Sequence, residues 1–320
     1  MAEATLPLVG VQTYDHTMGE LHGYRTQMDA CYMRDALIPL DSKRKMDLTI
    51  NTYGYDVDSV SYEVRSLDTQ RKIADTKVSD WNKDGNTWTK SLQIENLVDE
   101  GQEYLFILKL HCKSDDLYYY TRITLPEETY AKKCLEFTDS FHNVSMSDQY
   151  ELLASYIEPA DYTDKNDLGN VNINSSIDQI GWRGFAGKQV GDPLVSFTDI
   201  NDTYASLVYT YQMAEEADGA TNYYKVEEYY KVRYTDQQIY LLDYQRSMEQ
   251  IIDTASVNVS GNILSVGVTS DTTGYLSNET GTIVSFVQSG QLFEYNQNKQ
   301  TFTKVYGFID DPTDARQSYG

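Results

Sequence analysis

The 320-residue chain has few cysteines, prolines and histidines, and it has far fewer basic than acidic residues. With 26 Lys and Arg against 49 Asp and Glu, its net charge is −23, which repels the phosphates of nucleic acids and of anionic lipids. We therefore expect no nucleic-acid partner. No apolar run reaches the roughly 18 residues of a membrane-spanning helix, and residues 1–10 lack the basic and apolar regions of a signal peptide. We expect no membrane insertion and no signal or anchor within this chain.

The three cysteines cannot all pair within the chain, and none of them lies in a Cys-x-x-Cys motif. Structural zinc and a redox motif are therefore not expected, and neither is a cofactor. One disulfide, between Cys31 and Cys112, remains open at this stage.

Tyrosine, in contrast, is abundant: 28 Tyr stand against 9 Phe and 3 Trp. A tyrosine ring suits strand positions that are half exposed, because its hydroxyl can stay hydrated while the ring packs. An apolar content of 40% is too high for a disordered acidic chain. The composition therefore predicts a folded protein of the mainly all-β class, and the length suggests two domains.

Residues 34–126 have the pattern of an all-β unit. Apolar and polar residues alternate in 45–50 and in 59–65, as in strands with one buried face. Further strand-like runs follow at regular spacing, at 87–94, 104–111 and 117–123. About six or seven short strands in such a length predict a β-sandwich. Residues 1–33 precede it as an N-terminal lead-in, which we expect to be helical.

A local signature sharpens this prediction. Leu97, Gly101 and Tyr104 precede the most apolar strand. They resemble the corner of fibronectin type III and immunoglobulin-like domains, where a Leu, a turn glycine and a Tyr lead into the sixth strand. The resemblance implies an Ig- or type III-like sandwich in which the Tyr hydroxyl bonds to backbone upstream. The sequence has one more residue than the usual type III spacing, and it lacks the proline.

Residues 127–169 change character and predict a helical connector with a loop. Tyr130, Cys134, Phe137 and Phe141 recur at a spacing of three and four, which predicts one helix. A second, short helix is expected over 149–156, before Pro159.

Residues 170–320 predict a second, Tyr-rich β domain. A strand is expected over 171–177, followed by a meander of three strands and by a later set of three; the meander covers 205–213, 222–234 and 238–244, and the later set 281–295 and 301–306. The last stretch resembles a β-propeller blade. Because the region holds only about three such units and a propeller needs at least four, we expect either a truncated propeller from a longer protein or a closed sandwich.

Catalytic and metal motifs are not found. Asp80, Asn82 and Asp84 match the first half of a calcium loop, but Ser91 stands where its bidentate Glu should be, and an Asp-Gly turn between two strands explains the pattern better. The chain has no Gly-x-Ser-x-Gly and no His-Glu-x-x-His, and its four histidines are scattered. We expect no metal, no catalytic residues and no enzyme.

These observations favour a binding protein. In the adjacent pairs Tyr223–Tyr224 and Tyr229–Tyr230 only one ring of each can face the core, so the other can contact a ligand. Trp182 is a further candidate contact residue. The chain is similar in style to extracellular proteins of Gram-positive bacteria, which implies an extracellular or cell-surface interaction module with a protein or glycan partner. A carbohydrate-active enzyme or accessory domain, and a structural spacer, are the alternatives.

Overall fold

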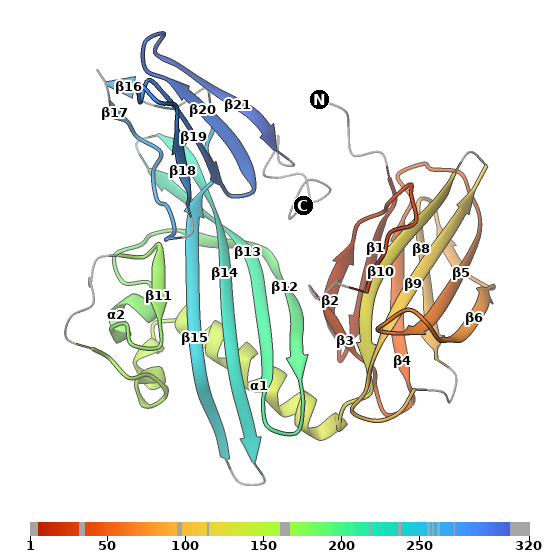
Figure 1. Cartoon of the computed structure of the whole chain (residues 1–320). Coiled ribbons are helices and arrows are strands. Elements are labelled where there is room, and N and C mark those ends of the chain that lie inside the picture. The colour runs from red at the N-terminus through yellow and green to blue at the C-terminus, as the bar shows by residue number, and fades with distance from the viewer. Residues whose placement is uncertain are drawn as a thin grey trace. The chain divides into compact units, whose positions relative to one another are not determined.

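The computed structural model describes the chain from residue 6 to residue 307 with short gaps (Figure 1); the described residues are 6–31, 36–94, 98–113, 115–160, 167–217, 219–235, 238–254, 257, 259–260, 263–271 and 273–307. Their secondary structure is mainly β, as the composition predicts. The chain divides into two compact units, each built from several stretches; unit 1 is Met1–Ser140, Leu194–Val208 and Tyr230–Leu242, and unit 2 is Phe141–Pro193, Tyr209–Tyr229 and Asp243–Gly320.

Unit 1 contains a five-stranded antiparallel sheet in the order β2-β1-β4-β8-β7. Its strands are β1 (Leu8–Thr13), β2 (His16–Leu21), β4 (Lys45–Asn51), β7 (Asn82–Asp84) and β8 (Thr87–Gln93). The alternation in 45–50 buries Met46, Leu48 and Ile50 on one face and exposes the residues between them to different degrees.

Five neighbouring strands of a second, larger sheet lie in unit 1 in the order β3-β10-β9-β5-β6, and β3 joins β10 in parallel. These strands are β3 (Leu37–Pro39), β5 (Val57–Ser66), β6 (Lys72–Val78), β9 (Glu103–Cys112) and β10 (Asp116–Thr124). Figure 1 shows them lying over the first sheet. Tyr62 stacks on Phe106 with ring centroids 5.3 Å apart, in the layer of buried side chains. The opposite face of β9 is covered as well, since Leu105 and Ile107 pack with Ala30.

The predicted corner before β9 has the expected hydrogen bond. Tyr104 Oη accepts from the backbone N–H of Asp99 at 3.1 Å, and Gly101 adopts φ +71° in the turn. A positive φ is favourable for glycine and strained for most other residues. Leu97 lies outside the described residues.

The helical lead-in expected over residues 1–33 is wrong for 8–21, which form the β1–β2 hairpin. Val9 and Val11 are buried on one face of β1, a period of two that a helix cannot use. The hairpin turns at Tyr14 and Asp15, both with positive φ. Neither is a glycine, so the usual sequence signal for such a turn is missing.

The predicted connector helix is confirmed as α1 (Glu128–Ser145), and the short helix after it as the 3-10 helix η1 (Tyr150–Tyr156). Cys134 and Phe141 are buried on the face that the spacing predicts. The Phe141 ring lies 5.1 Å from that of Tyr244, measured between centroids.

The predicted meander of three strands is confirmed as β13 (Ala205–Ala217), β14 (Ala220–Thr235) and β15 (Gln238–Gln250). A fourth long strand, β12 (Lys188–Ile200), precedes them and is not predicted, and the four strands contribute residues to both units. In unit 2 the strand order is β12-β13-β14-β15-β11, where β11 is Asn170–Asn172. The strand expected over 171–177 ends at Asn172, because the Asn172 side chain accepts from Asn174 N. Ser176 and Gln179 then form a capping box that begins helix α2 (Ile177–Ile180).

A separate four-stranded antiparallel sheet follows in unit 2, in the order β18-β19-β20-β21. Its strands are β18 (Tyr275–Ser277), β19 (Ile283–Gln288), β20 (Gln291–Asn296) and β21 (Thr301–Gly307), and a two-stranded ladder, β16 (Val259–Ser260) and β17 (Ile263–Leu264), precedes it. The last three strands are those that the sequence predicts. Phe286 and Phe293 form its buried cluster with Ile252.

Candidate functional site

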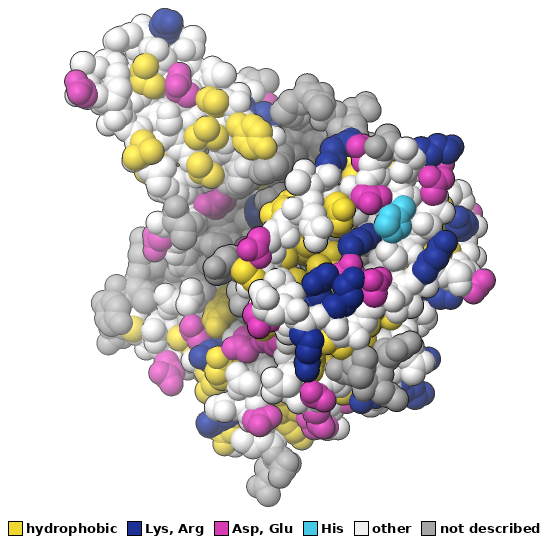
Figure 2. All heavy atoms as spheres, turned by 45° about the vertical axis from the view of Figure 1, so that its right-hand side comes forward, with side chains coloured by type: hydrophobic (Ala, Val, Ile, Leu, Met, Phe, Trp, Pro, Cys, Tyr) yellow, Lys and Arg dark blue, Asp and Glu magenta, His cyan; other side chains and the backbone are white. Residues whose placement is uncertain are grey.

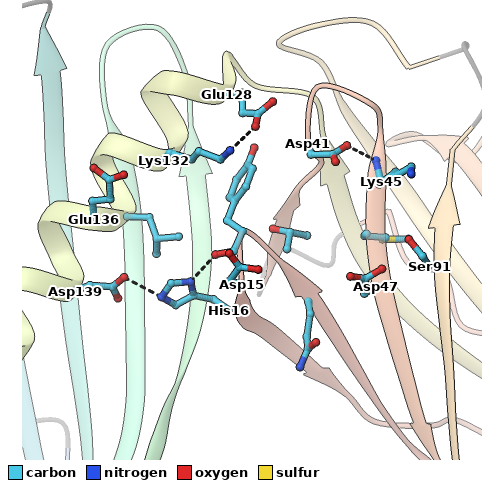
Figure 3. Close-up of a pocket in the computed structure, with 15 residues that line it drawn as sticks. Asp15, His16, Asp41, Lys45, Asp47, Ser91, Glu128, Lys132, Glu136 and Asp139 are labelled. Carbon is cyan, nitrogen blue, oxygen red and sulfur yellow. Dashed lines mark hydrogen bonds and ion pairs between the residues drawn. The ribbon is translucent and has the colours of Figure 1, made fainter.

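One cavity of unit 1 is an acidic pocket of about 560 Å³, where α1 faces the β1–β2 turn and the start of β4 (Figure 3). Its wall carries six carboxylates, from Asp15, Asp41, Asp47, Glu128, Glu136 and Asp139. Lys45, Lys132 and His16 supply the basic groups.

Several of these carboxylates hold the pocket wall together. Glu128 pairs with Lys132 and accepts from Ser42 N at 2.9 Å, and these two partners lower the pKa of Glu128 to about 2. Asp41 Oδ1 accepts from Lys45 N at 2.7 Å and so fixes the loop before β4. The acidic groups therefore join α1 to the loops around it, and we assign this pocket a structural role.

His16 connects β2 to α1. Its Nε2 lies 2.8 Å from Asp139 Oδ2, and its Nδ1 lies 2.8 Å from the carbonyl oxygen of Tyr14. Both ring nitrogens face acceptors, so both donate when the ring is an imidazolium. The hydrogen bond to Asp139 raises the pKa of His16, while burial opposes it.

This raised pKa gives a pH-dependent stability. The contribution of the His16–Asp139 pair is complete below the unfolded pKa near 6.5 and is lost as pH rises through the folded pKa. His16→Asn should therefore destabilise the protein at pH 6 by less than about 1 kcal/mol, since the pair is partly exposed. Urea unfolding at pH 6 and pH 9 measures the difference, which should shrink at pH 9. A difference of the same size at both values would refute the assignment, and Asp139→Asn should reproduce the pattern.

Unit 2 contains a groove of about 550 Å³ over β11, β15 and β14. Most of the residues that line it are polar, and they include Asn170, Asn172, Asn174, Glu227, Tyr229, Asp243, Gln245, Ser247, Ser270 and Asp271. Strand alternation produces this lining. Tyr244, Arg246 and Met248 are buried on one face of β15, so Gln245 and Ser247 project from the other.

Contacts within the groove fix its polar side chains before any ligand arrives. Gln245 Nε2 donates to Asp243 Oδ2 at 3.1 Å, and Asn170 Oδ1 accepts from Asp271 N at 2.7 Å. Gln245 and Asn172 are direct partners in the β11–β15 ladder, which places their side chains next to each other. Fixed polar groups reduce the entropy that binding costs.

The structure separates the predicted contact residues. Tyr224 and Tyr230 are buried, whereas Tyr223 and Tyr229 are half buried, so one ring of each pair is accessible as predicted. Only Tyr229 among the five candidates lines the groove. Trp182 is buried, with the Arg246 guanidinium 3.5 Å above its ring, so it offers no exposed face.

Beneath the groove's sheet lies a buried polar network. Glu228 is fully buried and accepts from Tyr211 Oη at 3.0 Å and Tyr244 Oη at 3.2 Å, and its other oxygen lies 2.8 Å from His142 Nδ1. His142 Nε2 faces Gln189 Oε1 at 2.9 Å, and Gln189 Nε2 donates to the Gly191 carbonyl, which fixes that amide. Burial and the charge of Glu228 raise the pKa of both tyrosines well above its usual value.

The cysteines and the calcium candidates lie apart from both cavities. None of Cys31, Cys112 and Cys134 is in a disulfide, so the Cys31–Cys112 bridge is not formed. Within the described part of the chain no group of three or more His, Cys, Asp or Glu is arranged to hold a metal.

The residues that match a calcium loop form a hairpin, as the alternative interpretation predicts. Asp80 precedes β7, and Asn82 and Asp84 lie in it. Asp84 pairs with Thr87 of β8 across a turn in which Gly85 has φ +57°. An Asp-Gly turn of this kind is typical of a tight hairpin.

Most of the groove is not predicted from the sequence. Its residues on β14 and β15 are the polar members of alternating strands, a signal that the sequence does contain. Asn170, Ser270 and Asp271 come from distant segments, and nothing local indicates that they meet.

No helix among the described residues is both long and apolar enough to cross a bilayer.

Comparisons with known proteins identify no family for this chain. No model of a protein family matches the sequence, and no curated protein is significantly similar to it.

Proposed function

We propose that the chain is an extracellular or cell-surface binding module that takes a polyhydroxylated ligand, a glycan, in the groove over β11, β15 and β14. The observation that carries this proposal is the joint presence of Tyr229, fixed amides and carboxylates along one cavity of ligand size. Ligand pockets of about 300–1,000 Å³ with a few well-placed polar groups are typical of small-molecule sites.

The chemistry of the lining favours a neutral ligand that donates hydrogen bonds. Glu227, Asp243 and Asp271 are carboxylates that accept hydrogen bonds from hydroxyl groups, and they repel anions. Asn172 and Gln245 carry both donors and acceptors. The Tyr229 ring supplies an apolar face for the C–H side of a sugar ring.

Two architectural proposals support a role outside the cell. In unit 1, β1, β4 and β8 share one sheet while β5, β9 and β10 share the other, which is the distribution of strands A, B, E and C, F, G in Ig-like sandwiches. The β18–β21 meander has the form of one propeller blade. Such modules are frequent in binding proteins, but the fold by itself does not specify a ligand.

The test is calorimetric titration of the protein with neutral hexasaccharides of glucose, xylose, mannose and N-acetylglucosamine. Tyr229→Ala should weaken the binding of the recognised sugar by about tenfold or more, because stacking and burial of one aromatic ring are worth about 1.5 kcal/mol or above. Tyr275→Ala is the matched control, since Tyr275 is 55% exposed on β18 and does not line the groove.

The outcomes separate the alternatives. Binding that Tyr229→Ala leaves unchanged, or no binding to any of the four sugars, would contradict the proposal. A protein partner would then be the next candidate, and a spacer role would follow if the groove variants have no effect on any interaction. Shortening of a hexasaccharide, lost in Glu227→Gln or Asp243→Asn, would instead indicate a carbohydrate-active enzyme.

A further inference from the structure

Three residues of unit 1 form a hydrogen-bonded chain on the outer face of the β5–β9–β10 sheet. Ser61 Oγ lies 3.0 Å from His111 Nε2, and His111 Nδ1 lies 3.0 Å from Asp116 Oδ1. His111 and Asp116 are direct partners in the β9–β10 ladder, and Ser61 is on β5 next to β9. Three separate strands therefore bring together a serine, a histidine and an aspartate in the order that activates a nucleophile.

The direction of the hydrogen bonds suits this chemistry. An ionised carboxylate only accepts, so Asp116 accepts a hydrogen bond from His111 Nδ1–H and fixes that tautomer. The lone pair of Nε2 then faces the hydroxyl of Ser61, which is the arrangement of a general base. The His111 and Asp116 side chains are 38% and 47% exposed, so solvent and reactants can reach them.

Two lysines flank the serine. Lys77 on β6 and Lys109 on β9 are the ladder partners of Ser61 on its two sides, so their side chains project from the same face. Lys109 also pairs with Glu63, whereas Lys77 is exposed. Figure 2 shows Lys and Arg side chains gathered on this side of the molecule with a histidine among them. In a chain with a net charge of −23 this is an unusual setting, and ammonium groups stabilise a developing oxyanion.

We propose that Ser61, His111 and Asp116 form a nucleophilic relay that accepts an acyl group from small, activated carboxylic esters. Ser61 Oγ bonds to the carbonyl carbon while its proton passes to His111 Nε2. The carbon–oxygen bond to the leaving alcohol breaks, and that alcohol takes the proton. Water, deprotonated by His111, then releases the carboxylic acid and regenerates Ser61. Asp116 acts as a positioning residue, and Lys77 faces the oxyanion.

The open sheet face limits the rate. Strand N–H groups are used in the ladders, so the relay has no pair of free backbone donors of the kind found in efficient hydrolases. The expected gain comes from general-base catalysis, about 10²–10⁴-fold over an ordinary serine. The proposal is independent of the groove in unit 2, and the sequence gives no motif for it because the three residues are far apart.

Labelling with a fluorophosphonate tests the relay directly. Ser61 Oγ displaces fluoride from phosphorus, and peptide mass spectrometry of the wild-type protein locates the adduct. We expect it at Ser61 in preference to Ser59, its neighbour two residues earlier on the same strand. Ser61→Ala should abolish the adduct, His111→Gln should slow labelling by about 100-fold or more, and hydrolysis of p-nitrophenyl acetate should fall in parallel.

The role of Asp116 has its own readout. Asp116→Asn should slow labelling, and Asp116→Glu should recover part of the rate because a carboxylate can again hold the Nδ1 proton. Ser59→Ala should change nothing. An adduct distributed over several serines, or a labelling rate at Ser61 that His111→Gln leaves unaltered, would overturn the proposal. Site mapping on the wild-type chain gives this answer even where a variant folds poorly.

Discussion

Replacing Glu228 by Gln should lower the free energy of unfolding of unit 2 by about 2–4 kcal/mol, because it changes one acceptor of a fully buried hydrogen-bonded group into a donor. Glu228 is fully buried and accepts hydrogen bonds from the hydroxyls of Tyr211 and Tyr244, and its carboxylate lies 2.8 Å from His142 Nδ1. An amide of the same shape places an N–H₂ group against at least one of these donors. The His142 ring, whose two nitrogens both face oxygen atoms, also loses the carboxylate that accepts at its Nδ1 side.

The measurement needs a probe confined to unit 2. The chain has 3 Trp, and Trp182 lies in unit 2 whereas Trp81 and Trp88 lie in unit 1. In a Trp81→Phe/Trp88→Phe background, the fluorescence of Trp182 therefore reports the urea unfolding of unit 2. The shift of the midpoint at constant slope gives the change in stability.

Glu227→Gln is the matched control for Glu228→Gln. Glu227 is the preceding residue of β14 and is exposed on the opposite face, so its change should stay within about 0.5 kcal/mol. A loss below about 1 kcal/mol in Glu228→Gln would mean that the network adds little to stability. Adding His142→Gln should cost less than the sum of the two single changes, because the residues share one network.

The sequence predicts those parts of the fold in which the pattern is local. Alternation over 45–50 and 59–65 indicates β4 and β5, since burial on one face of a strand repeats every two residues. The β1–β2 hairpin is not predicted from the sequence, because Tyr14 and Asp15 adopt positive φ in its turn although neither is a glycine. The strand expected over 171–177 stops early, because Asn and Ser side chains there bond the backbone in place of a neighbouring strand.

The candidate sites depend on contacts that no local pattern contains. Alternation correctly predicts that one ring in each tyrosine pair is accessible, but only the fold shows that Tyr229, and not Tyr223, lies in the groove. A serine, a histidine and an aspartate meet on β5, β9 and β10 only because strand register aligns them. The sequence predicts Trp182 as a contact residue because it does not show what covers the ring. The cover is Arg246, which comes from a strand far along the chain.

Arg246 provides the second large effect. Its guanidinium donates to the carbonyl oxygens of Gln179 at 2.6 Å and Ile180 at 3.0 Å, at the end of α2, and stacks on Trp182. Arg246→Met keeps most of the volume but leaves two buried carbonyl groups without these donors. The expected loss is about 2–4 kcal/mol. The Ile180 carbonyl loses its donor at a cost of about 1–3 kcal/mol, the Gln179 carbonyl keeps the Trp182 N–H at 3.2 Å, and the lost cation–π contact adds to this.

Arg246→Lys distinguishes the planar fork from the positive charge. A lysine keeps the charge but presents one compact ammonium, which cannot reach both carbonyl groups in the geometry of a guanidinium. We therefore expect it to recover less than half of the stability lost in Arg246→Met, by Trp182 fluorescence in the same background. Arg183→Met is the control, because Arg183 is exposed and pairs at the surface with Asp178, so its change should leave the unfolding midpoint nearly unaltered. If Arg246→Lys were as stable as the parent, charge alone would hold α2 and Trp182 against β15, and the two hydrogen bonds would be dispensable.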